Sequence, residues 1–164
     1  MPRISRSVVT SIVFLGGLLA VCGSTRSAFA QSDPAVGSWK LNVTKSRYSP
    51  GPAPKSQTIT ITAAGNGIRV SAKGVDGDGK ATSTEYTASY DGKDVPVLFN
   101  LVYDVTSLKR IDANTSELVR KKSGKVVQTA RRAISAEGKT MTITTTGVDD
   151  KSRKVDNVAV YDKQ

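Results

Sequence analysis

The chain has 164 residues, a formal net charge of +10, no histidine and a single cysteine. This length suits one domain with a short leader. Without histidine, the Ser-His-Asp and Cys-His catalytic groups and the usual zinc sites are excluded, as is haem ligation by histidine. Carboxylates, lysines, tyrosines and hydroxyls remain, so the composition argues against an enzyme and predicts neither a metal nor another cofactor.

The first residues have the pattern of a secretory signal peptide. Arg3 and Arg6 supply a positive start, an apolar run follows over 8–22, and Ala28-Phe29-Ala30 is an A-x-A cleavage site. The apolar run is shorter than the roughly 20 residues that a stable membrane span needs. We therefore expect export to the periplasm or beyond the cell, with no stable membrane span after cleavage.

Cleavage leaves residues 31–164 as a single domain after a signal peptide of residues 1–30. Cys22 leaves with the signal, so the mature domain can form no disulfide. Three arginines and no acid also leave, so the formal net charge falls from +10 to +7. This excess favours solubility, and as a partner it favours anionic lipid or polysaccharide over nucleic acid. The alternative of a lipoprotein anchored at Cys22 is disfavoured because Val21 stands where a small residue is expected.

Nearly all of the mature chain has the alternating pattern of β-strands, interrupted by turn residues. Within residues 57–62, for example, Ile59 and Ile61 alternate with threonines, and an Asn-Gly pair lies a few residues further on. Asn-Gly is a strong signal for a two-residue hairpin turn. The expected strands cover residues 36–43, 57–62, 68–72, 82–90, 95–105, 106–111, 116–121, 126–134, 140–146 and 155–162.

About ten short strands joined by tight turns predict an all-β, antiparallel up-and-down meander, which forms either a sandwich or a barrel. The barrel is favoured because large apolar residues are few and because pairing the last strand with the first removes both exposed edges. The connection over 44–55 is rich in proline, which disfavours regular hydrogen bonding. We expect this connection to run across one end of the barrel.

The two ends of the mature chain carry a family resemblance. Gly37-Ser38-Trp39-Lys40-Leu41-Asn42 and the closing Val158-Ala159-Val160-Tyr161-Asp162-Lys163 resemble the calycin superfamily of lipocalins and fatty-acid-binding proteins. The chain also resembles small exported bacterial proteins of unassigned function that begin G-[ST]-W-K-L-N. The resemblance implies a calycin-like barrel that binds a small apolar ligand inside.

Two features depart from the fatty-acid-binding proteins. Their helical lid has no counterpart, because the connection over 44–55 is too short and too rich in proline. Their closing R-x-Y motif, in which arginine and tyrosine hold the ligand carboxylate, is here Ala159 and Tyr161. Arg131 or Arg132 on a neighbouring strand is a candidate for the missing cation.

Five residues are candidates for ligand binding: Trp39, Phe99, Tyr103, Arg132 and Tyr161. Trp39 is interpreted as a plug of the barrel floor or as a ligand contact. The family analogy turns Tyr161 and Ala159 inward, whereas hydrophobic alternation turns Val158 and Val160 inward, and the sequence leaves this open.

The segment 95–103 is the most apolar part of the mature chain, and Phe99 and Tyr103 belong to it. It is either a strand buried on both faces or an apolar rim that forms a portal or a self-association patch. Pro96 would cost a hydrogen bond within a central strand and indicates a strand start, an edge or a bend.

The acidic residues fall mostly in predicted turns, where a short acid stabilises the turn itself. Asp76-x-Asp78-Gly79 resembles the start of a calcium loop, but Thr87 stands where the closing glutamate is required. No pair of carboxylates is placed for acid–base catalysis.

The sequence therefore predicts an exported lipocalin-like protein that binds a small hydrophobic or amphipathic ligand non-covalently, with the segment from Phe99 to Tyr103 near the entrance. The alternative is a cell-envelope structural or interaction protein whose barrel is filled with side chains and whose outer face binds protein or polysaccharide.

Overall fold

The computed structural model describes residues 33–164, which form ten antiparallel strands and one short 3-10 helix. The strands are β1 (Gly37–Leu41), β2 (Ser56–Ala64), β3 (Gly67–Val75), β4 (Ala81–Ser89), β5 (Asp91–Pro96), β6 (Val105–Arg110), β7 (Thr115–Lys122), β8 (Lys125–Ile134), β9 (Thr140–Val148) and β10 (Lys154–Lys163), and the helix is η1 (Val43–Lys45). The expected signal peptide lies outside the described residues.

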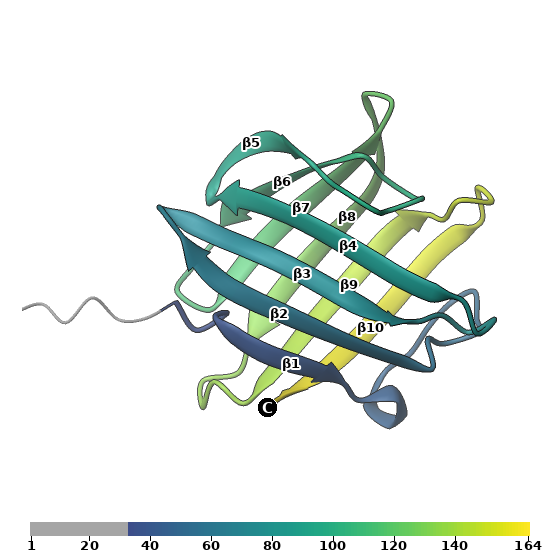
Figure 1. Cartoon of the computed structure of the whole chain (residues 1–164), viewed down its shortest axis with the longest axis horizontal. Helices are drawn as coiled ribbons and strands as arrows, with labels where there is room; N and C mark the ends of the chain where they lie inside the picture. The colour runs from purple at the N-terminus through teal and green to yellow at the C-terminus, as the bar shows by residue number, and fades with distance from the viewer. Residues whose placement is uncertain (1–32) are drawn as a thin grey trace, which may run out of the picture. The chain divides into compact units, whose positions relative to one another are not determined.

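The strands follow one another around a barrel (Figure 1), with the order β4-β3-β2-β1-β10-β9-β8-β7-β6-β5. β1 pairs with β10 through Trp39 opposite Lys163 and Leu41 opposite Tyr161. The barrel is almost closed between β4 and β5, where Glu85 and Leu98 exchange two backbone hydrogen bonds of 3.1 and 2.9 Å. The predicted up-and-down barrel of ten strands is confirmed.

The strands form where the sequence alternates. In β2, Ile59 and Ile61 are buried while the threonines that alternate with them are exposed. The following hairpin turns at Gly65, which has a φ of 55°, one residue before the expected Asn-Gly pair. Gly67 instead belongs to β3, where a Cβ would overlap the carbonyl oxygen of Ala88 in β4.

The fifth strand differs from the prediction. The prediction of a strand over residues 95–105 is wrong, because β5 covers Asp91–Pro96 and residues 97–104 form a loop. Pro96 has no N–H to continue the pairing, and Phe99 adopts a φ of 61°. Asn100 then folds the loop, since its Oδ1 accepts hydrogen bonds from the backbone N–H groups of Val102 and Tyr103 at 2.9 and 3.1 Å.

The proline-rich connection has two parts. After η1, Arg47 pairs with Val158 through backbone hydrogen bonds of 2.8 Å in both directions, so this part extends the β1–β10 pairing. Further along, Pro52 lies against Gly77 in the β3–β4 turn. The connection thus leads from β10 to the β3–β4 turn at one end of the barrel, as expected.

The two ends of the barrel differ. At one end, which we call the closed end, the segment before β1 and the side chains of Trp39, Ile68, Leu108 and Met141 fill the interior. The other, open end is formed by the proline-rich connection, the loop over 97–104 and the β3–β4, β7–β8 and β9–β10 turns. The core therefore occupies one half of the barrel and leaves room in the other.

Candidate ligand-binding cavity

A cavity of about 250 Å³ lies inside the barrel. Its lining comes from seven strands, the proline-rich connection and the loop over 97–104, and it combines aliphatic, tyrosine, amide and guanidinium groups. The lining residues are Tyr48, Pro54, Gln57, Ile59, Ile61, Val70, Ala72, Thr84, Tyr86, Asn100, Tyr103, Leu118, Arg120, Gln128, Arg132, Met141, Ile143, Thr145, Asn157, Ala159 and Tyr161.

The structure shows which face of β10 turns inward. Ala159 and Tyr161 are buried and line the cavity, whereas Val158 and Val160 are only partly buried and face the other way. The expectation from hydrophobic alternation is therefore wrong at this strand, and the family analogy gives the right face. The backbone of Val158 and Val160 is hydrogen-bonded to Arg47 and to the Ser46 hydroxyl, respectively.

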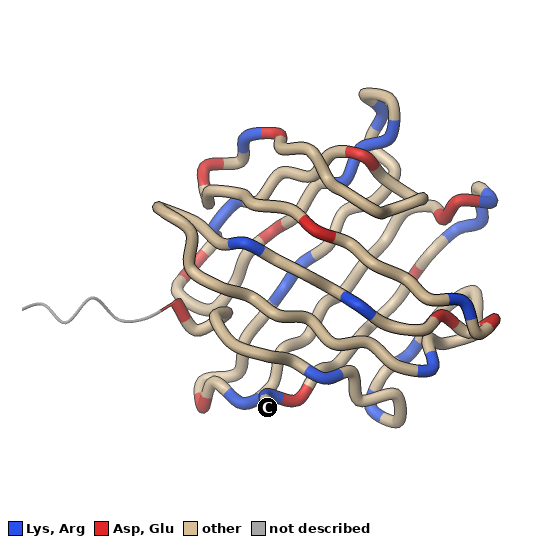
Figure 2. The backbone as a smooth tube through the Cα atoms, in the orientation of Figure 1, with Lys and Arg blue, Asp and Glu red and all other residues tan. Residues whose placement is uncertain are grey.

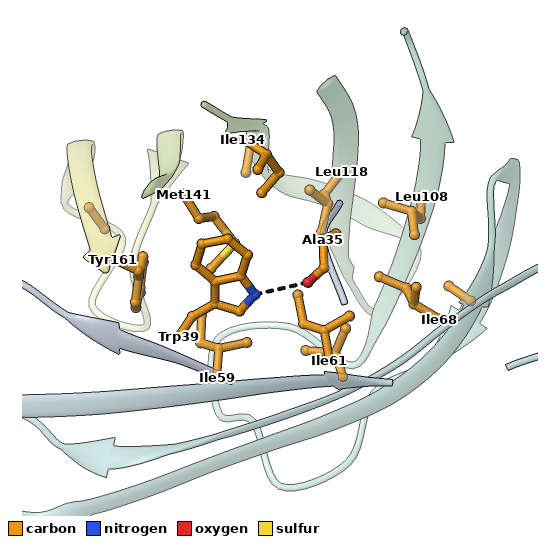
Figure 3. Close-up of a cluster of buried hydrophobic side chains, with 14 of the residues drawn as sticks. Ala35, Trp39, Ile59, Ile61, Ile68, Leu108, Leu118, Ile134, Met141 and Tyr161 are labelled. Carbon is orange, nitrogen blue, oxygen red and sulfur yellow. Dashed lines mark hydrogen bonds between the residues drawn. The ribbon is translucent and has the colours of Figure 1, made fainter. Parts of the chain in front are cut away.

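Trp39 forms the floor of the cavity region (Figure 3). Its side chain is fully buried against Ile59, Met141 and other core residues, and its Nε1 donates a hydrogen bond of 2.8 Å to the carbonyl oxygen of Ala35. Trp39 is not among the residues that line the cavity. Its position is that of the plug considered from the sequence.

The segment before β1 closes the barrel end through Asp33. The Oδ2 atom of Asp33 accepts hydrogen bonds of 2.6 Å from both the Tyr90 hydroxyl and the Arg110 guanidinium, and Arg110 also lies 3.6 Å from the centre of the Tyr90 ring. Burial raises the pKa of the Asp33 carboxyl, but hydrogen bonds from Tyr90, the Ala35 N–H and Arg110 outweigh it and lower the pKa overall. Asp33 is thus held as a carboxylate.

Arg132 connects this closed end with the cavity. It is only 3% exposed. Its Nε donates to the Ser116 hydroxyl at 3.1 Å, and one Nη donates to the Tyr90 hydroxyl at 3.3 Å. Arg132 lines both the cavity and the small pocket beside Asp33, so its guanidinium separates the filled half of the barrel from the hollow half.

Arg120 is the second cation of the cavity. Its Nη1 donates a hydrogen bond of 2.9 Å to Gln128 Oε1, and its guanidinium carbon lies 4.8 Å from the centre of the Tyr103 ring. Its Nε is buried and, within the part of the chain that the structure describes, has no hydrogen-bond partner. A buried donor left without an acceptor is costly and rare.

The charge of the cavity is unbalanced. None of the lining residues is an aspartate or glutamate, and within residues 33–164 neither Arg120 nor Arg132 forms an ion pair. Buried arginines are normally paired, because an isolated charge in the interior is expensive. The cavity therefore offers two guanidinium groups to an anion.

Tyrosines surround these cations. Burial raises the pKa of Tyr86, while the charges of Arg132 and Arg120 act to lower it. The Tyr161 hydroxyl donates a hydrogen bond of 2.5 Å to Gln57 Oε1, and burial raises the pKa of Tyr48 to about 12. These phenols stay neutral at physiological pH and provide hydroxyl groups inside the barrel.

The structure brings three of the five predicted site residues together. Tyr103, Arg132 and Tyr161 line the cavity. Trp39 lies beneath it, and Phe99 points away from it with 70% of its surface exposed. Of the two candidate cations on β8, Arg132 faces inward while Arg131 is exposed on the outside of the barrel.

Sequence reasoning missed Arg120, Gln128 and Tyr86. The signal was present for the first two, because Leu118 and Ala130 face inward and residues two positions away on a strand share that face. Charged and amide side chains are mostly exposed in folded proteins, so Arg120 and Gln128 were not expected on an inward face. The loop over 97–104 also concealed how Tyr103 and Asn100 reach the cavity.

Comparisons with known proteins assign this chain to no family. No model of a known protein family matches the sequence, and no curated protein matches it. The structure is similar to the crystal structure of zebrafish ileal bile acid-binding protein complexed with cholic acid, with a TM-score of 0.47 and 10% sequence identity over 80% of this chain and 99% of that chain. Across residues 33–164 there is no helix with the length and apolar character needed to cross a bilayer.

Proposed function

We propose that this chain is an exported binding protein for a small amphipathic anion, such as a carboxylate with a short apolar chain or ring. The observation that carries the proposal is the pair Arg120 and Arg132 in a cavity without a carboxylate. Binding is non-covalent, and no catalytic step is proposed.

The charged groups favour an anion over a neutral ligand. Taking a cation out of water costs several kcal/mol unless an opposite charge or good hydrogen bonds compensate. An arginine guanidinium offers five donors in a planar fork that matches a carboxylate or phosphate. Arg120 lines the cavity, and Gln128 holds its guanidinium in place through Nη1.

The apolar groups favour a ligand with a hydrocarbon part. Ile59, Ile61, Val70, Leu118 and Ile143 line the same cavity as the arginines. The volume of about 250 Å³ lies just below the usual range of roughly 300–1,000 Å³ for small-molecule sites. We therefore expect a short chain or a single ring in preference to a long fatty acid.

Export is proposed from the leader alone, through Arg3, Arg6 and the Ala28-Phe29-Ala30 site. The rival function, a barrel filled with side chains that binds protein or polysaccharide on its outer face, is less favoured, because only the closed half of the barrel is filled.

Calorimetric titration of the delipidated protein, residues 31–164, tests the proposal. Octanoate and its neutral analogue 1-octanol have the same chain length and differ in charge. A hydrogen bond to a charged group contributes about 1.5–3 kcal/mol, so octanoate should bind at least about tenfold more tightly. Binding of neither compound, or equal affinity for both, would overturn the proposal.

A further inference from the structure

A group of exposed apolar side chains marks the open end of the barrel. Leu98, Phe99 and Leu101 in the loop over 97–104 are 54%, 70% and 71% exposed, and Val126 beside the β7–β8 turn is 58% exposed. These four make up most of the six exposed large hydrophobic residues that the described chain contains. Single exposed apolar residues are ordinary, whereas a group of them at one site indicates an interaction surface.

The loop is held in the conformation that exposes these side chains. Leu98 is fixed to β4 by its two backbone hydrogen bonds with Glu85. Asn100 Nδ2 donates to the Thr84 hydroxyl at 2.9 Å, while Asn100 Oδ1 accepts from the next turn of the loop. The exposure of Phe99 and Leu101 is therefore built into the fold.

Phe99 is strained in this position. Its φ of 61° lies in the left-handed region, which bulky side chains rarely adopt. Strain of this kind persists where the surrounding structure imposes it, and it is concentrated at functional sites. A strained aromatic residue that gains no burial in the barrel points to a partner outside it.

Lysines lie beside the apolar loop. The β7–β8 hairpin carries Lys122 and Lys125 at its tip (Figure 2), and it contacts the loop through hydrogen bonds of Asp104 with the backbone of Lys121 and Ser123. The Nζ of Lys122 lies 3.9 Å from Oδ2 of Asp104, which is a long distance for an ion pair. Exposed leucine and phenylalanine side chains flanked by lysine are typical of protein segments that insert into the headgroup region of anionic membranes.

We propose that the loop over 97–104 and the β7–β8 hairpin form a docking surface for an anionic lipid bilayer. Phe99 and Leu101 enter the headgroup region, and Lys122 and Lys125 contact the lipid phosphates. Asn100 and Tyr103 of the same loop line the cavity, so docking turns the cavity mouth toward the membrane. Docking to the membrane does not require a ligand in the cavity. A negative result for docking would therefore leave the proposal of anion binding in the cavity unaffected.

The test is flotation of residues 31–164, which contain every described strand and core residue, with phosphatidylglycerol–phosphatidylcholine vesicles. The double variant Phe99→Ala/Leu101→Ala should lower the bound fraction at least tenfold with an unchanged urea midpoint. Ile111→Ala is the matched control, because Ile111 is 48% exposed but lies beside the β6–β7 turn at the other end of the barrel. Lys122→Gln/Lys125→Gln should weaken binding to these vesicles and leave any binding to pure phosphatidylcholine unchanged.

A second readout reports insertion directly. In a Phe99→Trp variant, the emission should shift to shorter wavelength when the anionic vesicles are added. Flotation of the double variant as complete as that of the wild type would overturn the proposal, as would a wild type that does not float. A dimer in sedimentation that dissociates in the double variant, with no vesicle binding, would assign the surface to a second copy of the chain.

Discussion

The Nζ of Lys163 lies 5.0 Å from the centre of the Trp39 ring, and the two residues stand opposite each other in the β1–β10 pairing. The same lysine side chain lies over Gly37, where a Cβ would come within 2.7 Å of its Cε, and Gly37 has a φ of 141°. The first and last strands are thus joined by a glycine that makes space, a tryptophan that fills the interior and a lysine that covers both.

Replacement of Trp39 should show how much of this arrangement stabilises the barrel. Trp39→Ala removes a fully buried side chain and its hydrogen bond to Ala35, which should cost about 3–5 kcal/mol. Lys163→Ala removes an exposed cation–π contact and should cost no more than about 1 kcal/mol. Urea unfolding measures both, and similar losses from the two variants would contradict the assignment of Trp39 as the plug.

Asp33 should make the barrel sensitive to acid. Its pKa is lower in the folded chain than in the unfolded chain. Its stabilising effect is therefore present above the unfolded pKa of about 3.9 and is lost as the pH falls through the lower folded pKa. At neutral pH, Asp33→Asn should cost about 2 kcal/mol, since it weakens charge-assisted hydrogen bonds with Tyr90 and Arg110.

The check is urea unfolding at a series of pH values from neutral to acid. Glu137→Gln, an exposed change in the β8–β9 turn, serves as the control and should behave as the wild type. If Asp33→Asn and the wild type have the same stability at neutral pH, then Asp33 does not hold the closed end.

Tyrosine ionisation should destabilise the barrel in alkali. Burial raises the pKa of Tyr48 to about 12, and burial with the hydrogen bond to Asp33 raises the pKa of Tyr90 to about 12. Groups with a raised pKa contribute stability that is complete below the unfolded value of about 10 and is lost as the pH rises through the folded value. Phenolate absorbance and circular dichroism should therefore change together between about pH 10 and 12. Full ionisation of all tyrosines near pH 10 with the native spectrum retained would contradict this.

We expect Arg120 to lower the stability of the barrel and to contribute to ligand binding. Arg120→Met keeps much of the side-chain volume and removes a partly buried cation whose buried Nε has no partner among the described residues. We expect the free energy of unfolding to stay the same or to rise by about 1 kcal/mol, and octanoate affinity to fall at least about tenfold. Urea unfolding and calorimetry measure the two effects, and a clear loss of stability would indicate a structural role for this arginine.

The strand pattern made most of the fold predictable, because the mature sequence alternates and its turns carry glycine, aspartate or asparagine. The failure at 95–105 has a specific cause. The composition of this segment resembles a buried strand, but Pro96 ends the pairing and Asn100 folds the backbone through its side chain. No periodicity in the sequence reports such a side-chain contact.

The site was less predictable for a different reason. Tyr161 faces inward although two valines alternate with it, so hydrophobic alternation alone does not identify the inward face of β10. The role of Asp33 was not predicted, because it depends on Tyr90 and Arg110 from distant strands. Arg120 could have been found from its spacing to Leu118, but only by accepting a charged residue on an inward face.

The central claim is that Arg120 and Arg132 make the cavity selective for an anion. The most direct measurement compares octanoate with 1-octanol by calorimetry on the wild type, on Arg120→Gln/Arg132→Gln and on the exposed control Arg131→Gln. The account predicts that the wild type and Arg131→Gln prefer octanoate at least about tenfold, and that the double variant, still folded by circular dichroism, binds both compounds alike. Octanoate preference that survives in the folded double variant would contradict the account.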